Sequence, residues 1–155
     1  MLVVTPSPKS QLSECSLRPL VSVTPDTSLA DVAEVLLEGN LSCVLVGVPG
    51  ELCSIVTERD LARAWRRELS GSDPVRLVAV PRPLTIGSDA TVFDAAALML
   101  RYGIRHLVVT DQSRAVGVLS IRDALTALVG EHGSRELATQ AIQWALSEQP
   151  EIWWG

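Results

Sequence analysis

The sequence is short of the residues that most often carry out chemistry. Three of its 155 residues are cysteines, two are histidines, and a single lysine, Lys9, stands among 13 basic residues. Three unevenly spaced cysteines without a C-x-x-C pair do not make a disulfide framework or a thiolate metal centre. The histidines, His106 and His132, lack the spacing of metal ligands, so we predict no metal site. One lysine disfavours Schiff-base catalysis, and no Ser/His/Asp or Cys/His group can be assembled, so we expect no catalytic residue and no enzyme.

The sequence also lacks an excess of positive charge and any long apolar run. Its formal net charge is −5 and its pI is about 5.0, which argues against binding to nucleic acid or to anionic lipid. No apolar run approaches the ~20 residues that a membrane span needs, and Met1–Ser10 has no secretory leader pattern. We therefore expect a soluble, cytoplasmic protein without a membrane partner. The content of 47% apolar and 20% charged residues is typical of a folded globular chain.

An internal repeat organises the chain. Sliding the sequence by 63 residues superposes Asp26–Ala62 on Asp89–Leu125 with the same apolar pattern throughout. Just upstream, Arg18-Pro19-Leu20 matches Arg82-Pro83-Leu84 at a shift of 64, so the first copy has one extra residue before Asp26. Repeats of this length predict two similar units rather than one continuous domain.

Each copy predicts the same order of elements. A short extended segment precedes a helix with apolar residues at i, i+3, i+4, i+7 and i+8, from Leu29 in the first copy and from Val92 in the second. Two β-branched runs follow, and in the first copy we expect a Pro49-Gly50 turn that pairs Cys43 with Val56. A second helix closes each copy, at 58–69 and 121–130.

The predicted fold class is therefore α+β, with two β-α-β-β-α repeats. We expect the repeats to pack sheet to sheet with pseudo-twofold symmetry, because one copy alone could hardly bury its sheet. The predicted division of the chain is a loosely ordered N-terminal arm at 1–16, repeat 1 at 17–70, a connector at 71–81, repeat 2 at 82–130, and a C-terminal helix with a tryptophan-containing tail at 131–155.

A Ser/Thr-x-x-Asp pattern stands at the start of all four predicted helices. Its plain interpretation is a helix-capping box, which stabilises a helix by about 0.5–2 kcal/mol. The copies at Thr57–Asp60 and Ser120–Asp123 directly follow a predicted strand, where the free amides of a helix N-terminus favour an anion. There the hydroxyl suits a phosphate and the carboxylate suits the paired hydroxyls of a ribose. Capping and binding are compatible, since the same side chains can do both.

The doubled unit, with each copy ending in a hydrophobic-hydrophobic-Thr/Ser-x-x-Asp segment, resembles a tandem pair of CBS (cystathionine-β-synthase) domains, also called a Bateman module. The resemblance covers residues 17–130. It implies a regulatory module without catalysis, which forms homodimers and binds adenosine-containing ligands in clefts between the repeats. AMP, ADP or ATP is the candidate ligand, with S-adenosylmethionine or NAD as further possibilities, and no cofactor is required. An enzyme or transporter that the sequence does not identify would read the signal.

The resemblance also implies which residues bind the ligand. The ribose-binding acid falls on Asp60 and Asp123, and the phosphate-side hydroxyl falls on Thr57 and Ser120. Thr85, Ile86 and Val23 would line the base pocket, and Arg105 would face the phosphates. Arg122 is a further candidate because it lies inside the second motif. The family's motif glycine is present as Gly117 but is replaced by Ser54 in the first copy, so the Asp123 site is favoured.

Two other hypotheses stay open. The chain could be a ligand-free dimerisation and docking module with degenerate clefts, which the altered residues of the first copy (Ser42, Cys43 and Ser54) support. An unrecognised enzyme is the third hypothesis, although no chemical constellation for it is found. For Arg105, a pairing with Asp111 or Asp123 is as plausible as a phosphate contact, and Trp65 is a candidate dimer contact.

Overall fold

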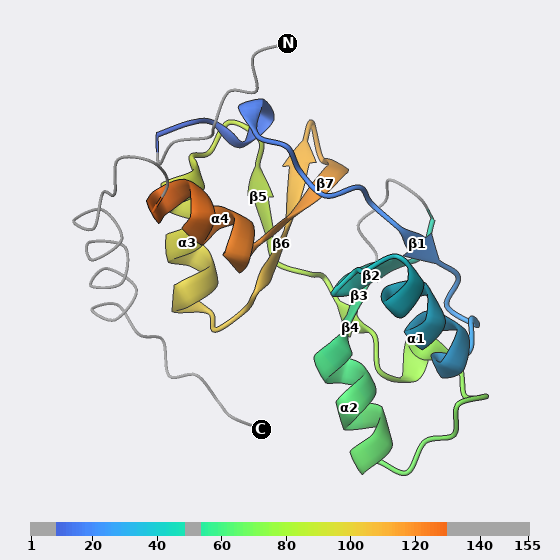
Figure 1. The fold of residues 1–155 in the computed structure, drawn as a ribbon. Helices are drawn as coiled ribbons and strands as arrows, with labels where there is room; N and C mark the ends of the chain where they lie inside the picture. The colour runs from blue at the N-terminus through green and yellow to red at the C-terminus, as the bar shows by residue number, and fades with distance from the viewer. Residues whose placement is uncertain (1–8, 49–53, 130–155) are drawn as a thin grey trace. The chain divides into compact units, whose positions relative to one another are not determined.

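The computed structural model describes residues 9–48 and 54–129 (Figure 1). These residues form two compact units, each with its own sheet and helices, so the fold is α+β as predicted. Unit 1 contains residues 9–18, 85–111 and 117–129 of the described chain, and unit 2 contains residues 19–48, 54–84 and 112–116. The predicted C-terminal helix, the tryptophan tail and the Pro49-Gly50 turn lie outside the described residues. The packing of the two sheets against each other stays a prediction.

Unit 2 holds a four-stranded sheet in the order β1-β2-β3-β4. Its elements are β1 (Ser22–Val23), α1 (Leu29–Glu38), β2 (Cys43–Val46), β3 (Ser54–Thr57), α2 (Glu58–Arg66), a 3₁₀ turn at Val75–Leu77 and β4 (Val80–Pro81). The parallel pair β1 and β2 is joined through α1, whereas β3 runs antiparallel to both of its neighbours. Helix α1 packs on β2 and helix α2 packs on β3.

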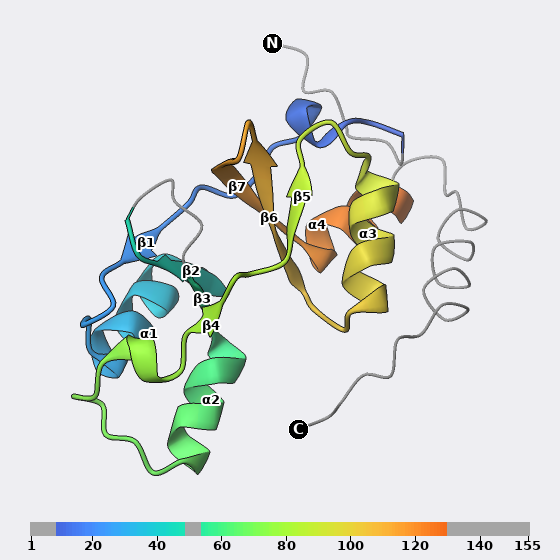
Figure 2. The same cartoon turned by 180° about the vertical axis from the view of Figure 1, so that it is seen from behind.

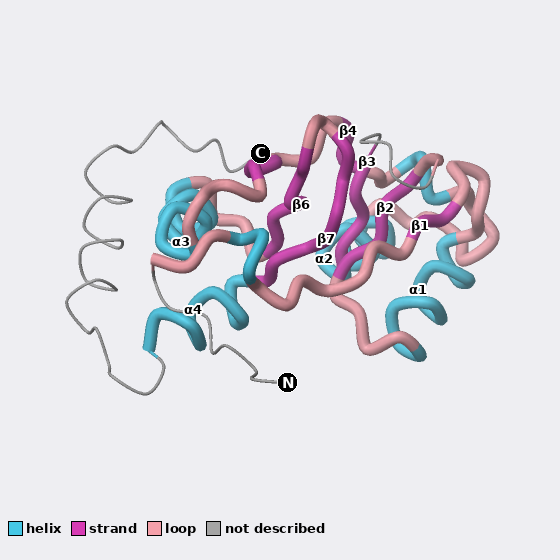
Figure 3. The backbone as a smooth tube through the Cα atoms, turned by 90° about the horizontal axis from the view of Figure 1, so that it is seen from above, coloured by secondary structure: helices cyan, strands magenta, loops and turns pink. Residues whose placement is uncertain are grey.

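Unit 1 repeats this arrangement with a three-stranded sheet in the order β5-β6-β7. Its elements are a 3₁₀ turn at Leu12–Glu14, β5 (Thr85–Gly87), α3 (Val92–Arg101), β6 (His106–Asp111), β7 (Arg114–Ser120) and α4 (Ile121–Val129). The first three residues of β7 and the turn before them are grouped with unit 2. Helices α3 and α4 lie side by side and cover the same side of this sheet (Figures 2 and 3). Gln112 and Ser113 join β6 to β7 with positive φ angles of 45° and 67°, as a tight hairpin turn requires.

The bounds of all four helices confirm the repeat, because each helix of unit 1 begins and ends 63 residues after its counterpart in unit 2. Strand register agrees: Ser22 pairs with Leu45 and Thr85 pairs with Val108, so each residue of the first pair has its counterpart 63 residues on. The extra residue of the first copy therefore lies upstream of β1.

Each unit has its own core, and each core includes a residue from the segment that precedes the other repeat. In unit 1, fully buried Leu12 packs with a cluster that includes Met99 and Leu107. In unit 2, fully buried Val75 packs with a cluster that includes Val32 and Val56. These apolar contacts are the main driving force for docking both segments.

Two expectations about the first half of the chain are wrong. The predicted N-terminal arm is not loose over its described residues, since Leu12 is buried and its amide donates to the Ala90 carbonyl at 2.9 Å. One apolar residue among polar neighbours carries no periodic signal, which is why the pattern missed it. The register between β2 and β3 is also shifted by one, because Cys43 pairs with Thr57 rather than with Val56. The expected register followed from a two-residue turn at Pro49-Gly50, and the observed pairing of β2 with β3 differs from it by one residue.

Candidate functional site

All four Ser/Thr-x-x-Asp motifs are helix caps in the structure. In each, the hydroxyl donates to the carboxylate three residues later, over distances of 2.5–2.7 Å, in the pairs Ser28–Asp31, Thr57–Asp60, Thr91–Asp94 and Ser120–Asp123. Three of the hydroxyls also accept the amide of that same residue, at 3.1–3.2 Å, and at the fourth motif the Asp60 carboxylate accepts the Thr57 amide at 2.9 Å. These bonds to free backbone amides confirm the capping interpretation at every copy.

Burial separates the two motifs that follow strands from the other two. Asp31 and Asp94 are exposed, whereas Asp60 is buried and Asp123 is half-buried. The reason lies in the chain path: β3 runs directly into α2 and β7 runs directly into α4, so each carboxylate sits where a sheet meets a helix. A charged group in such a place needs partners, and each of these carboxylates has them.

Asp123 is held from two sides. Its Oδ2 accepts hydrogen bonds from Ser120 Oγ at 2.5 Å and from Arg18 Nε at 3.0 Å, and its Oδ1 accepts from Arg18 Nη2 at 3.4 Å. Partial burial by itself raises the pKa of Asp123, but the hydrogen bonds from Arg18 and Ser120, together with the charge of Arg18, outweigh it. The pKa of Asp123 therefore lies below its usual value, and the group is a carboxylate at neutral pH.

The backbone of Arg18 is fixed against β7. Its amide donates to the Val118 carbonyl at 3.0 Å, and the Val118 amide donates back at 3.1 Å. Gly117 makes this approach possible, since a Cβ at that position would lie 2.6 Å from the Cβ of Leu17 and 3.3 Å from the Arg18 carbonyl oxygen. Gly117 thus allows the segment with Leu17 and Arg18 to lie directly against β7, which places Arg18 next to Asp123.

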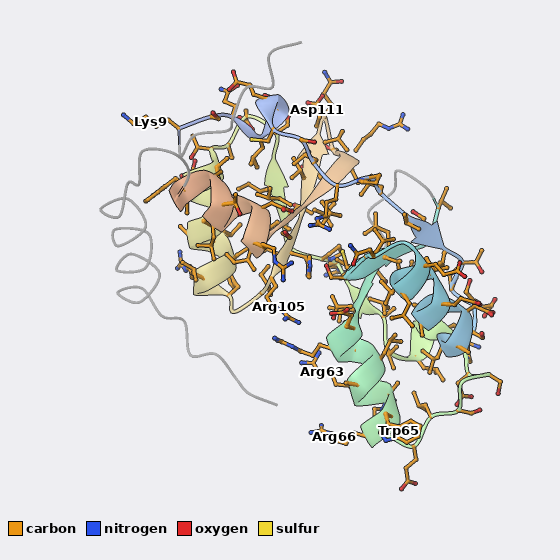
Figure 4. The ribbon with its side chains drawn as sticks, in the orientation of Figure 1. Lys9, Arg63, Trp65, Arg66, Arg105 and Asp111 are labelled. Atoms are coloured by element: carbon orange, nitrogen blue, oxygen red, sulfur yellow. The ribbon has the colours of Figure 1, made fainter. Side chains whose placement is uncertain are left out.

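Asp60 is satisfied by its own helix and the strand before it. Its Oδ2 accepts from the Thr57 amide at 2.9 Å and from Thr57 Oγ1 at 2.7 Å, and its Oδ1 accepts from Arg63 Nη1 at 2.8 Å. The Asp60 residue is 3% exposed. Figure 4 shows Arg63 and Arg66 projecting from the same side of α2.

The remaining predicted residues lie around these two junctions. In unit 1, Arg105 stands at the start of β6 beside the motif, because its carbonyl accepts from the amide of Ile121, the first residue of α4, at 2.8 Å. Its exposed side chain extends away from the sheet (Figure 4), and Arg122 is exposed on α4. Thr85 and Ile86 lie on β5, which β6 separates from β7.

Val23 occupies the corresponding place in unit 2, on β1, with β2 between it and the Thr57–Asp60 motif. Its side chain packs against the core of unit 2, as that of Ile86 does in unit 1. Thr85, next to Ile86 on the strand, is half-buried, as Ile86 is, so both positions on β5 keep some exposed surface.

Sequence reasoning missed Arg18, the residue that contacts Asp123 most closely besides Ser120. Three alternatives were open for Arg105, namely a phosphate contact and a pairing with Asp111 or with Asp123, and the arginine bonded to Asp123 in the structure is Arg18. The signal was present in the repeated Arg-Pro-Leu triplet, but the two residues of the pair are 105 positions apart. A separation of that length cannot be inferred from local spacing.

The described part of the chain has neither a metal-binding cluster nor a membrane-spanning helix. No group of three or more His, Cys, Asp or Glu side chains there could hold a metal ion. None of its helices is long and apolar enough to cross a membrane.

Comparison with known proteins identifies the repeated unit. The sequence model of the CBS domain matches this chain twice, over residues 12–67 and 75–130. The chain belongs to the CBS domain family. The two matches begin at Leu12 and Val75, so each includes the segment that packs into the core built around the other repeat.

Among solved structures, this CBS domain chain is similar to the CBS domain protein PAE2072 from Pyrobaculum aerophilum, solved in complex with AMP. The identity is 33% and the TM-score is 0.72, with 84% of this chain and 99% of that chain covered. An uncharacterised 17.7 kDa protein from Acidianus ambivalens is 30% identical over 79% of this chain and 76% of its own length. The CBS domain-containing protein YhcV from Bacillus subtilis is 25% identical, over 74% of this chain and 82% of its own length.

Proposed function

We propose that this chain is a regulatory module that binds an adenosine nucleotide, with AMP as the first candidate, at the Ser120–Asp123 junction. The observation that carries the proposal is an ionised, half-exposed carboxylate next to a hydroxyl at the N-terminus of a helix that directly follows a strand. The relative from Pyrobaculum aerophilum, at 33% identity, was solved with AMP, which supports the choice of ligand.

Each chemical part of a nucleotide has a suitable group here. A carboxylate accepts hydrogen bonds from the two hydroxyls of a ribose, and the side chain of Asp123 is 37% exposed. The N-terminus of α4 favours a phosphate through its amides and its dipole. Arg105, joined to the first turn of α4 by a backbone hydrogen bond, and Arg122 add positive charge nearby. Thr85 and Ile86 on β5 are the candidates for the base.

We expect the corresponding site in unit 2 to be the weaker one. The oxygens of both Asp60 and Asp123 already accept hydrogen bonds, but Asp60 is 3% exposed whereas the side chain of Asp123 is 37% exposed. A ribose would have to displace the partners of Asp60, and an unpaired buried charge is costly. Binding by Thr57, Asp60 and Val23 thus stays a secondary proposal.

The proposed role is binding without chemistry. A ligand that prefers one of two arrangements of a homodimer shifts their populations by its differential affinity. A partner enzyme or transporter would bind one of the two arrangements preferentially, so that the ligand regulates the interaction. ADP, ATP, S-adenosylmethionine and NAD remain candidate ligands, and no metal or further cofactor is part of the proposal.

Isothermal titration calorimetry with AMP, ADP, ATP, S-adenosylmethionine and NAD tests the proposal on ligand-free protein. We expect at least one compound to bind, and Asp123→Ala to weaken its binding more than Asp60→Ala does. Asp94→Ala is the matched control, because Asp94 caps α3 with the same geometry but is exposed. Asp94→Ala should lower the free energy of unfolding by about 0.5–2 kcal/mol, because a helix cap is lost, and should bind the ligand as the wild type does.

The alternative is a dimerisation and docking module with a degenerate site. The burial and saturation of Asp60, together with Ser54 in place of the motif glycine, favour it for unit 2. If ligand-free protein gives no heat with any of these compounds, the docking module replaces the sensor. Turnover of any of them would contradict the proposal that the chain only binds.

A further inference from the structure

We infer that Arg18 makes the Asp123 site selective for ligands that carry negative charge next to the ribose. The favoured class is ribonucleoside phosphates, over uncharged or cationic adenosine compounds. This inference rests on the proposed function, since it specifies which adenosine compounds that site accepts. It assigns a binding role to a residue that neither the repeated motif nor the predicted site contains.

Arg18 is bonded to both oxygens of the Asp123 carboxylate. Two of its nitrogens face the two oxygens of Asp123, at 3.0 Å and 3.4 Å, in the forked arrangement that guanidinium groups make with carboxylates. Ser120 Oγ shares Oδ2 with Arg18 Nε. Oδ2 of Asp123 therefore already accepts two hydrogen bonds and Oδ1 accepts one long bond, so a ribose diol that binds both oxygens competes with the guanidinium.

Arg18 cannot leave the site when it shifts. Its amide and carbonyl are both bonded to Val118, and the segment before it is anchored in the core of unit 1 through Leu12. The guanidinium stays charged at any pH at which the protein is folded. Its side chain is 39% exposed, so it would be left partly desolvated beside the ligand. A guanidinium held beside the ligand in this way favours a ligand that carries an anion over one that does not.

A phosphate on the ribose supplies that anion at the right place. The N-terminal amides of α4 begin at the same junction, so a phosphate bound to them lies beside the ribose-binding carboxylate. The fork of Arg18 can then pass from carboxylate to phosphate, which suits its geometry equally well. Adenosine or 5′-methylthioadenosine offers no such exchange, and the sulfonium of S-adenosylmethionine would add a like charge.

The other repeat shows that this arrangement is particular to unit 1. Asp60 takes its arginine, Arg63, from its own helix three residues on. The position of Arg63 corresponds to Thr126 in α4, whose hydroxyl donates to the Arg122 carbonyl at 2.8 Å instead. The counterpart of Arg18 in the repeated triplet is Arg82, which is exposed. Charge selection by an arginine from the segment before the other repeat is therefore expected at Asp123 and not at Asp60.

The test compares two ligands that differ only in the phosphate. Calorimetric titration of the full chain with AMP and with adenosine should show that the wild type prefers AMP by about tenfold or more. Arg18→Gln should weaken AMP binding by about tenfold and leave adenosine binding unchanged or tighter, so that the preference collapses. Arg18→Lys, which keeps the charge but not the fork, should retain part of the preference.

Arg76→Gln is the matched control. It removes an arginine whose Nε lies 3.0 Å from a carboxylate oxygen of Asp26, the same distance as in the Arg18–Asp123 pair, on the surface of unit 2. It should not change the ratio of the two affinities. Circular dichroism spectra that match the wild type confirm that each variant is folded. If Arg18→Gln does not fold, the affinities of Arg18→Lys for AMP and adenosine are the test.

Three outcomes overturn the inference. One is a wild type that binds AMP and adenosine equally well, and another is an Arg18→Gln variant that keeps the full preference. The third is an equal gain in affinity for both ligands in Arg18→Gln, which would make Arg18 a mere competitor of the ribose. Each of these leaves the proposed function standing, whereas a wild type that binds no adenosine compound overturns both.

Discussion

At the scale of single residues, identical side chains at four helix starts have unequal roles because their surroundings differ. Each hydroxyl and carboxylate pair caps a helix, but only Asp60 and Asp123 are withdrawn from solvent. Asp60 is enclosed by groups of its own helix and strand. Asp123 is instead paired with an arginine from a distant segment and keeps an accessible side. A displaceable partner is what distinguishes a candidate binding carboxylate from a purely structural one.

The lowered pKa of Asp123 predicts how stability depends on pH. The folded pKa is below the unfolded value of about 3.9, so the ionised carboxylate stabilises the fold. This contribution is complete above the unfolded pKa and is lost as the pH falls through the folded pKa. We expect Asp123→Asn to lose less stability than the wild type between pH 6 and pH 3, measured by urea unfolding.

Arg18→Ala should flatten the same pH profile, because it removes the main partner that lowers the pKa of Asp123. Adding Asp123→Asn to Arg18→Ala should then change the profile little. Additive effects of the two substitutions would contradict a direct coupling between the groups.

At the scale of elements, the segment before each repeat completes the unit built around the other repeat. The amides of Leu12 and Ser13 donate to the carbonyls of Ala90 and Ser88 at 2.9 Å and 2.8 Å. The corresponding bonds in unit 2 run from the amides of Val75 and Arg76 to the carbonyls of Thr27 and Pro25, at 2.8 Å and 3.1 Å. Both segments thus combine one buried apolar side chain with backbone hydrogen bonds to the loop before a helix.

Leu12→Ala tests this docking. The side chain is fully buried, so its truncation should lower the free energy of unfolding by about 2–5 kcal/mol. Ser13→Ala, at an exposed neighbour whose backbone bond is kept, should change it by less than about 0.5 kcal/mol. Chemical denaturation measures both. Equal effects of the two substitutions would show that the segment is not part of the core.

At the scale of the whole molecule, the repeat gives two similar units with unequal surfaces. Trp65 near the end of α2 is 83% exposed, whereas Leu128, at the same place in α4, is 1% exposed. A tryptophan left on a helix face is typical of a surface that contacts another protein. We expect this position to lie in the homodimer contact that the family resemblance implies.

Light scattering coupled to size-exclusion chromatography tests this expectation. The wild type should have the mass of a dimer, and Trp65→Ser should shift the equilibrium toward the monomer. Val116→Ser, at a strand residue that is 47% exposed, is the control and should leave the mass unchanged. A monomeric wild type, or a Trp65→Ser variant that dimerises as well as the wild type, would contradict the proposed contact.

What the sequence determined by itself is local or periodic. The repeat, the apolar stripe of each helix and the four caps are written within a few residues of each other, where spacing alone decides which side chains meet. These features were enough to predict the α+β repeats, and they placed Ser120 and Asp123 together at one junction.

Only the tertiary structure decided what pairs across long stretches of chain. Arg18 reaches Asp123 because two distant segments are brought together by a backbone bridge and a glycine that leaves room for Leu17. Leu12 is buried because it packs into the core built around the other repeat, and β2 pairs with β3 one residue away from the register that the Pro-Gly pattern indicated. Such contacts depend on the positions of both partners in the folded chain, so they cannot be predicted from the local sequence around either partner.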